Sequence, residues 1–143
     1  MNRRTILLVE DSEDDIELAC YALARASVPT EVVTMRSGEA AMDYLEQSFT
    51  DASERPRPDL VLLDLQLPGI SGLETLRRVR AIPDIRRTPV IMLTTSDDDR
   101  DIRASYDLGV NSYIRKPLDL ADFTAMINQL SVYWLQTNTR PPL

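Results

Sequence analysis

The sequence has 143 residues, of which 43% are hydrophobic and 27% charged, as expected for one globular domain. With 23 acidic and 16 basic residues its net charge is −7, which argues against binding to nucleic-acid phosphates or to an anionic membrane surface. It contains no histidine and one cysteine, so histidine catalysis, cysteine-ligated zinc and internal disulfides are excluded. The first apolar run is too short for a secretory signal and no run reaches transmembrane length, which predicts a cytoplasmic protein.

Short apolar runs alternate along the chain with amphipathic segments. Residues 6–9 predict a buried strand, after which Ser12 has the position of a helix N-cap with acidic residues 13–15 in the first turn. The apolar face of this helix comprises Ile16, Ala19, Cys20, Leu23 and Ala24. Residues 31–34 predict a weaker strand, and a second helix opens at Ser37.

The middle of the chain holds the clearest buried strand, at residues 60–63. The preceding polar segment, residues 50–58, contains two prolines and predicts a loop. Ser71 and Glu74 have the spacing of a capping box and start a third helix, and residues 90–93 predict a fourth strand.

The last third repeats the alternation. Residues 97–108 predict a polar helix that Gly109 can end, and residues 112–114 predict a short fifth strand. Asp119 is positioned to cap a final helix. The apolar residues of that helix are Leu120, Phe123, Met126, Ile127 and Leu130.

Five strand–helix units with apolar strands predict an α/β fold, a parallel sheet covered by helices on both faces. Sites in such sheets form at the carboxyl ends of the strands. The residues found directly after the predicted strands are Glu10, Asp11, Asp64, Thr94, Thr95, Ser96 and Lys116. We therefore expect acidic, hydroxyl and ammonium groups to meet at one edge of the sheet.

This combination of groups suits phosphoryl transfer. Three close carboxylates raise one another's pKa, and Mg²⁺, which prefers oxygen ligands, relieves the repulsion. Asp64 can then act as a nucleophile that forms an aspartyl-phosphate. Mg²⁺, Lys116 and the Thr94 hydroxyl would neutralise or bind the oxygens of the transferred group.

The motifs at these strand ends resemble those of a response-regulator receiver domain. They are Leu8-Val9-Glu10-Asp11, the run from Leu62 to Gly69, the run from Pro89 to Thr94, and Tyr113-Ile114-Arg115-Lys116-Pro117. The resemblance covers about residues 4–131. It implies a flavodoxin-like, doubly wound (βα)5 sheet with the strand order 2-1-3-4-5, here with a C-terminal extension.

The resemblance also implies a role for each motif residue. Asp64 would be the phosphoacceptor. Mg²⁺ would be held by Asp11, Asp64 and the Gln66 backbone carbonyl, and by Glu10 directly or through water. Lys116 would pair with the phosphate. Thr94 and the aromatic Tyr113 would move together as the switch. Gln66 and Ser96 would tune the phosphate lifetime. The Lys116–Pro117 peptide bond would be cis.

The C-terminal residues narrow the resemblance. Residues 131–136 and 140–142 are similar to those of single-domain regulators paired with phytochrome-type histidine kinases. We divide the chain into a receiver domain at residues 1–131 and a tail at residues 132–143 that contacts a second copy or another partner. The tail is too short for an output domain, so we expect a non-enzymatic switch that signals by protein contact or phosphorelay. The aromatic Tyr133 and Trp134 of the tail and the resemblance favour a homodimer.

Other interpretations of the same residues exist. A haloacid-dehalogenase-type phosphatase needs a second acid at the position of Gln66, and a flavodoxin would not place Glu10 and Asp11 against a flavin phosphate. A receiver-like scaffold that is never phosphorylated would usually lack a site residue. Taken singly, Asp11 could be a helix cap and Thr94 an ordinary strand residue. Cys20 is expected in the core, and the acidic run 97–99 at a solvated helix start.

Overall fold

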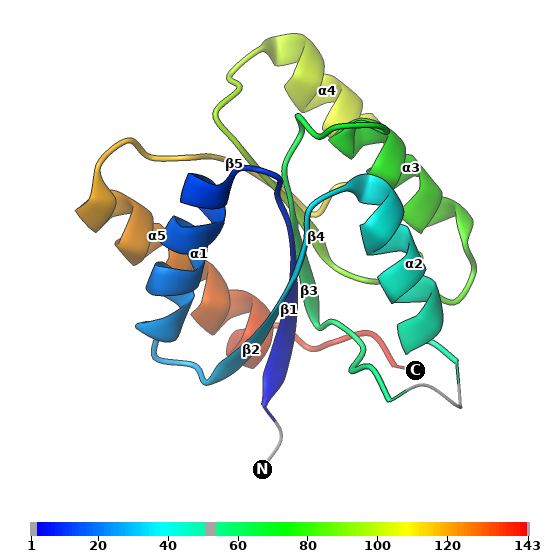
Figure 1. Ribbon diagram of the computed structural model, residues 1–143, viewed down its shortest axis with the longest axis horizontal. Coiled ribbons are helices and arrows are strands. Elements are labelled where there is room, and N and C mark those ends of the chain that lie inside the picture. Colours follow the sequence, from blue (N-terminus) through cyan, green and yellow to red (C-terminus); the bar gives the residue numbers. More distant parts are fainter. Residues whose placement is uncertain (1–2, 51–53, 143) are drawn as a thin grey trace.

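The computed structural model describes residues 3–50 and 54–142 as a five-stranded parallel sheet with helices on both faces (Figure 1). The strands are β1 (Arg4–Val9), β2 (Thr30–Met35), β3 (Leu60–Leu63), β4 (Val90–Thr94) and β5 (Ser112–Arg115). The helices are α1 (Glu13–Ala24), α2 (Gly38–Ser48), α3 (Gly72–Ala81), α4 (Asp99–Asp107), α5 (Leu120–Val132) and the π-helix η1 (Tyr133–Thr137). The order β2-β1-β3-β4-β5 confirms the predicted fold.

Strand residues alternate between two hydrophobic cores. Ile6 and Leu8 of β1 pack with α1 and α5, whereas Leu7 and Val9 pack with α2 and α3. Figure 1 shows α1 and α5 on one side of the sheet and α2, α3 and α4 on the other. Because β1, β3 and β4 are covered on both faces, their residues are almost all buried, while the edge strands β2 and β5 are half-buried.

Each α-helix begins at a side-chain N-cap. The caps are Ser12, Ser37, Ser71, Asp98 and Asp119. The fourth helix begins later than predicted because Asp98, whose carboxylate accepts from the Arg100 N–H at 2.9 Å, is its cap. The predicted capping box forms only in part, since Glu74 turns its carboxylate to the arginines of its own helix.

Two residues assigned to apolar helix faces lie elsewhere. Ala24 is exposed in the last turn of α1, where Ala22 is buried instead. Leu120, at the first position of α5, is 51% exposed. Cys20 is half-buried against the core, as predicted. Helix ends turn away from the sheet, so periodicity is a poor guide to burial in the first and last turns.

The C-terminal residues are bound to the edge of the sheet where the strands begin. Leu135 of η1 is 1% exposed and belongs to the core of α1 and α5. The Arg4 side chain donates to the Leu135 carbonyl at 3.0 Å, and Arg140 pairs with Asp59, the residue before β3. The tail therefore crosses the edge where the strands begin and ends beside the segment that joins α2 to β3 (Figure 1).

The predicted loop at 50–58 connects α2 to β3, and its residues 51–53 lie outside the described part of the chain. Within residues 3–50 and 54–142, no helix is both long enough and apolar enough to cross a membrane. Residue 143 of the tail is likewise outside the described part.

Candidate functional site

Three of the predicted site residues extend the backbone ladder of the sheet by one step each. The Glu10 N–H donates to the Met35 carbonyl at 3.0 Å, and the Asp64 N–H donates to the Val9 carbonyl at 3.0 Å. The Lys116 N–H donates to the Thr94 carbonyl at 2.7 Å. The parallel sheet thus fixes the backbone of all three at its carboxyl edge. A cleft of about 650 Å³ opens there, lined among others by Glu10, Asp11, Asp64, Gln66 and Lys116.

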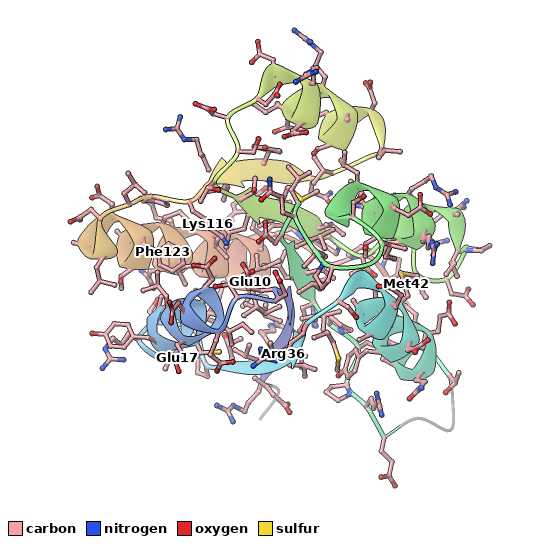
Figure 2. The ribbon with its side chains drawn as sticks, turned by 45° about the horizontal axis from the view of Figure 1, so that its top comes forward. Glu10, Glu17, Arg36, Met42, Lys116 and Phe123 are labelled. Atoms are coloured by element: carbon pink, nitrogen blue, oxygen red, sulfur yellow. The ribbon has the colours of Figure 1, made fainter. Side chains whose placement is uncertain are left out.

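Lys116 is the centre of the site. Its Nζ lies 2.7 Å from Glu10 Oε1, 3.1 Å from Asp15 Oδ2 and 3.6 Å from Asp64 Oδ2. The side chains of Lys116, Glu10 and Asp64 are 11%, 4% and 12% exposed, so these charges meet largely out of water. Lys116 and Glu10, the residues directly after β5 and β1, point toward one another (Figure 2).

The local charges shift both partners of the shortest pair. Burial raises the pKa of Glu10, the Asp64 charge adds to this, and the hydrogen bond from Lys116 opposes it. For Lys116 burial alone would lower the pKa. The hydrogen bond to Glu10 and the charges of Asp64 and Glu10 outweigh burial, so the pKa of Lys116 is raised and the ammonium form is favoured.

The carboxylates form a group that fits a hard divalent cation. Oxygens of Glu10, Asp15 and Asp64 lie within 4.8 Å of one another. Asp11 lines the same cleft, but its side chain is not part of that group and the residue is exposed. The structure therefore brings together two of the three predicted acidic ligands and adds Asp15.

Asp15 is the site residue that the sequence did not identify. It lies in the acidic first turn of α1, where a carboxylate is already explained by the helix dipole. Its position four residues after Asp11, one helical turn on, is the only signal in the sequence that could have placed both near the same edge.

The predicted switch residues lie in a hydrogen-bonded cluster beside the cleft. Thr94 is 2% exposed, and its hydroxyl accepts from the Ser96 N–H at 3.3 Å. The Tyr113 hydroxyl donates to the Ser96 carbonyl at 2.9 Å. Ser96 thereby links the end of β4 to β5.

The Gln66 N–H donates to Asp64 Oδ1 at 3.4 Å, which helps to orient the carboxylate from the loop after β3. The prediction of a cis peptide before Pro117 is wrong: the structure has no cis bond among its described residues, and the Lys116–Pro117 bond is trans. Trans is the intrinsically favoured form, by about 0.5–1 kcal/mol, and the ion pairs of Lys116 form with that geometry.

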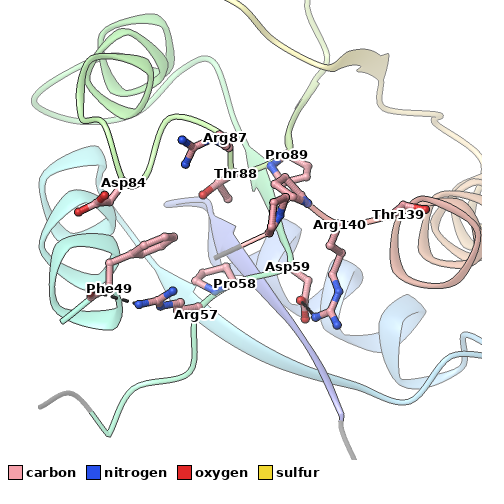
Figure 3. A pocket seen from close by; sticks show the side chains of 12 residues that line it. Phe49, Arg57, Pro58, Asp59, Asp84, Arg87, Thr88, Pro89, Thr139 and Arg140 are labelled. Atoms are coloured by element: carbon pink, nitrogen blue, oxygen red, sulfur yellow. Dashed lines mark hydrogen bonds and ion pairs between the residues drawn. The ribbon is translucent and has the colours of Figure 1, made fainter. Parts of the chain in front are cut away.

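A larger cavity, about 860 Å³, lies at the opposite edge of the sheet (Figure 3). It is enclosed by the loops before β3 and β4 and by the tail, with Phe49, Pro58, Pro89 and Arg140 in its walls. The charged side chains Asp59 and Arg140 are already paired there. We assign the chemistry to the smaller cleft because the grouped carboxylates and the buried ammonium lie there.

Comparison with known families matches residues 6–128 to the response regulator receiver domain. The chain is 41% identical over 138 residues to response regulator Rcp1 of Synechocystis sp., covering 96% of this chain and 93% of Rcp1.

Two solved structures are similar over nearly the whole chain. One is the phosphorylated cyanobacterial phytochrome response regulator RcpA, with a TM-score of 0.89, 42% identity and coverage of 99% of this chain and 100% of RcpA. The other is the Mn²⁺-bound form of Rcp1, with a TM-score of 0.85, 40% identity and coverage of 97% and 99%.

Proposed function

The chain belongs to the response-regulator receiver family, and from this premise we propose that it is a phosphorylation switch with Asp64 as the phosphoacceptor. The observation that carries the proposal is the buried contact of Lys116 with Asp64 and Glu10 at the carboxyl edge of the sheet. The phosphorylated state of the similar RcpA and the bound Mn²⁺ of the similar Rcp1 support it.

In the proposed reaction an Asp64 carboxylate oxygen attacks the phosphorus of a phosphohistidine. The phosphorus–oxygen bond forms as the phosphorus–nitrogen bond breaks, and the imidazole leaves with its electron pair. Lys116 then holds a phosphoryl oxygen with its ammonium group. The Thr94 hydroxyl, released from Ser96, donates to another.

We assign the cation site to Asp11, Asp64, the Gln66 carbonyl and Glu10, the last directly or through water. Mg²⁺ bound there would neutralise the carboxylates and one phosphoryl oxygen. Asp15 is proposed to hold Lys116 within reach of Asp64, since its carboxylate lies 3.1 Å from the ammonium. The chain itself catalyses the transfer and a slow hydrolysis, whose rate Gln66 and Ser96 would tune.

The proposed donor is a histidine kinase of the phytochrome type, because the similar regulator RcpA is described as a phytochrome response regulator. The homodimer and the cytoplasmic location remain part of this proposal. So does a role of residues 132–143 in a partner contact, for which the half-exposed ring of Tyr133 offers a surface. Output would be by protein contact or phosphorelay.

The proposal is tested by phosphotransfer from a purified phytochrome-type kinase that carries radiolabelled phosphohistidine. The label should pass to the wild-type chain in the presence of Mg²⁺. It should not pass to Asp64→Asn, because the amide has the same size as the carboxylate but is not a nucleophile. Far-ultraviolet circular dichroism of the variant controls for folding. Transfer to Asp64→Asn at the wild-type rate would refute the assignment.

A further inference from the structure

Ser96 is held by three different elements. Its N–H donates to the Thr94 hydroxyl of β4 at 3.3 Å, and its carbonyl accepts from Tyr113 of β5 at 2.9 Å. Its own hydroxyl donates to Asp101 Oδ2 of α4 at 2.6 Å. The loop after β4 is therefore fixed at one residue by a site hydroxyl, a β5 aromatic and a helix carboxylate.

Asp101 differs from the other acids around it. Asp97 pairs with Arg115, Asp98 with Arg100 and Asp99 with Arg103. The hydrogen bond of the Asp101 carboxylate, by contrast, is made to the loop of the phosphorylation site. An ionised acceptor makes this bond roughly twice as strong as a neutral one.

Helix α4 has little else to hold its first turn. Of its nine residues only Ser105 is buried, and that residue lies in the second half of the helix. Asp101 and its neighbour Ile102 are half-buried, and Asp99 and Arg100 are exposed. Besides the exposed ion pair of Asp97 with Arg115, the contact between Asp101 and Ser96 is what anchors the first turn of α4.

We propose that Asp101 is a positioning residue of the switch: by holding Ser96 it keeps Thr94 and the first turn of α4 in the resting arrangement. The inference rests on the proposed function, in which the Thr94 hydroxyl leaves Ser96 for the phosphoryl oxygen. That movement removes the Thr94 bond, and the Asp101 bond, together with the Asp98 N–H that donates to the Ser96 hydroxyl at 3.3 Å, opposes the displacement of the loop. Releasing Asp101 frees both the loop and the helix.

Titration with beryllium fluoride and Mg²⁺, a stable mimic of the phosphoryl group on a carboxylate, measures this restraint. Asp101→Asn keeps the shape but removes the charge, so the variant should bind the mimic about fivefold more tightly. Ser96→Ala should bind more tightly as well, and the double variant no more tightly than the tighter single one. Asp99→Asn, with the same charge loss on the same turn, should bind as the wild type does.

Affinity of Asp101→Asn equal to or weaker than that of the wild type would overturn the proposal. Additive effects of the two substitutions would do the same, because Asp101 would then act by another route. Binding by the wild type but not by Asp64→Asn checks the underlying switch chemistry in the same titration.

A second measurement needs no phosphoryl mimic. Amide hydrogen exchange of the resting chain should be faster at residues 95–98 in Asp101→Asn than in the wild type or Asp99→Asn, since the loop has lost an anchor. Unchanged exchange would show that Asp101 does not hold the loop. This outcome is independent of Asp64, so it separates a failure of the inference from a failure of the proposed function.

Discussion

Lys116 is the single lysine among 16 basic residues, and the fold places it against three carboxylates. Arginine would bring a larger, rigid fork, whereas an ammonium on a flexible stem can pair with Glu10 and Asp64 at once and follow a phosphoryl oxygen. The stability of the metal-free protein depends on the Lys116 ammonium group, because the carboxylates of Glu10 and Asp64 are close together and largely buried.

Lys116→Ala should therefore lower the free energy of unfolding of the metal-free chain by roughly 3–5 kcal/mol, because it leaves buried carboxylates unpaired. Mg²⁺ should restore part of the loss. Urea denaturation at neutral pH with and without Mg²⁺ measures both effects. Arg103→Ala, which removes an exposed pair, is the control and should cost at most about 1 kcal/mol. A loss as small as that of the control would contradict the role of Lys116 in the site.

Tyr113 provides a pH-dependent signal. Burial raises the pKa of its phenol above 10.0, and the charges of Asp101, Asp97 and Asp98 raise it further. A raised pKa stabilises the fold fully below pH 10, and this contribution is lost as the pH rises through the higher value.

Phenolate absorbance of the wild type minus that of Tyr113→Phe should give a transition above pH 10. Asp101→Asn should move this transition to lower pH, because one of the charges that raise the pKa is gone. A Tyr113 transition at or below pH 10 in the wild type would show that the ring is not held as described.

The sequence was sufficient to predict which residues belong to the site where those residues directly follow a strand. It was not sufficient to predict local backbone conformation. Glu10, Asp64 and Lys116 meet because parallel strands share an edge. The contribution of Asp15 and the exposed position of Asp11 depend on how the chain turns into α1, which the four-residue spacing of the two acids does not determine. The trans bond before Pro117 was likewise not predictable, because only a small free-energy difference separates the cis and trans forms of a bond before proline.

At the scale of elements, the close approach of α3 to β3 positions Asp64. A Cβ on Gly72 would lie 2.2 Å from the Asp64 carbonyl oxygen and 2.7 Å from Leu65 Cα, both backbone atoms. The Gly72 N–H also donates to Leu65 at 2.8 Å. Helix α3 thus starts against the backbone of Asp64, the proposed phosphoacceptor, and this close approach requires glycine.

Gly72→Ala should cost about 1–3 kcal/mol of stability and slow phosphorylation of Asp64, because the helix or the loop after β3 must shift. Leu135→Ala, which removes a core side chain packed between α1 and α5, is the control for lost stability and should leave the labelling rate unchanged. Denaturant unfolding and the labelling rate measure the two effects. Equal labelling rates for Gly72→Ala and the wild type would contradict the coupling of α3 to the site.

The tail is packed against the receiver domain through η1. Leu135→Ala should destabilise the chain by roughly 2–5 kcal/mol, because the side chain fills the core between α1 and α5. Leu118→Ala, at a side chain that is 99% exposed, should change stability by less than about 0.5 kcal/mol. Thermal unfolding of the two variants compares them directly. Similar midpoints would mean that the tail is not packed as described.

The element types were predictable from the sequence because apolar runs and capping residues are local signals. The strand order was implied by the resemblance to receiver domains and is confirmed. The attachment of the tail could not be predicted in this way. It depends on contacts between residues far apart in sequence, such as Arg4 with Leu135 and Asp59 with Arg140. The predicted homodimer remains to be tested, and Leu135 is not available for it because it is buried within the chain.

In the whole molecule, the two edges of the sheet carry different features. The carboxyl edge holds the charged cleft, and the amino edge holds the tail and the larger cavity (Figures 1 and 3). Phosphorylation at the first edge would act on the loop after β4 and on α4, which is the least buried of the helices that cover the sheet. Every one of these effects depends on the covalent chemistry proposed for Asp64.

That chemistry is tested most directly by the intact mass of the chain after incubation with acetyl phosphate and Mg²⁺. We expect one added phosphoryl group on the wild type and none on Asp64→Asn or in the presence of a chelator. A phosphoryl adduct that persists in Asp64→Asn, or that forms equally well with chelator, would contradict it. A wild type that takes up neither the phosphoryl group nor beryllium fluoride would instead identify the chain as an unphosphorylated receiver scaffold.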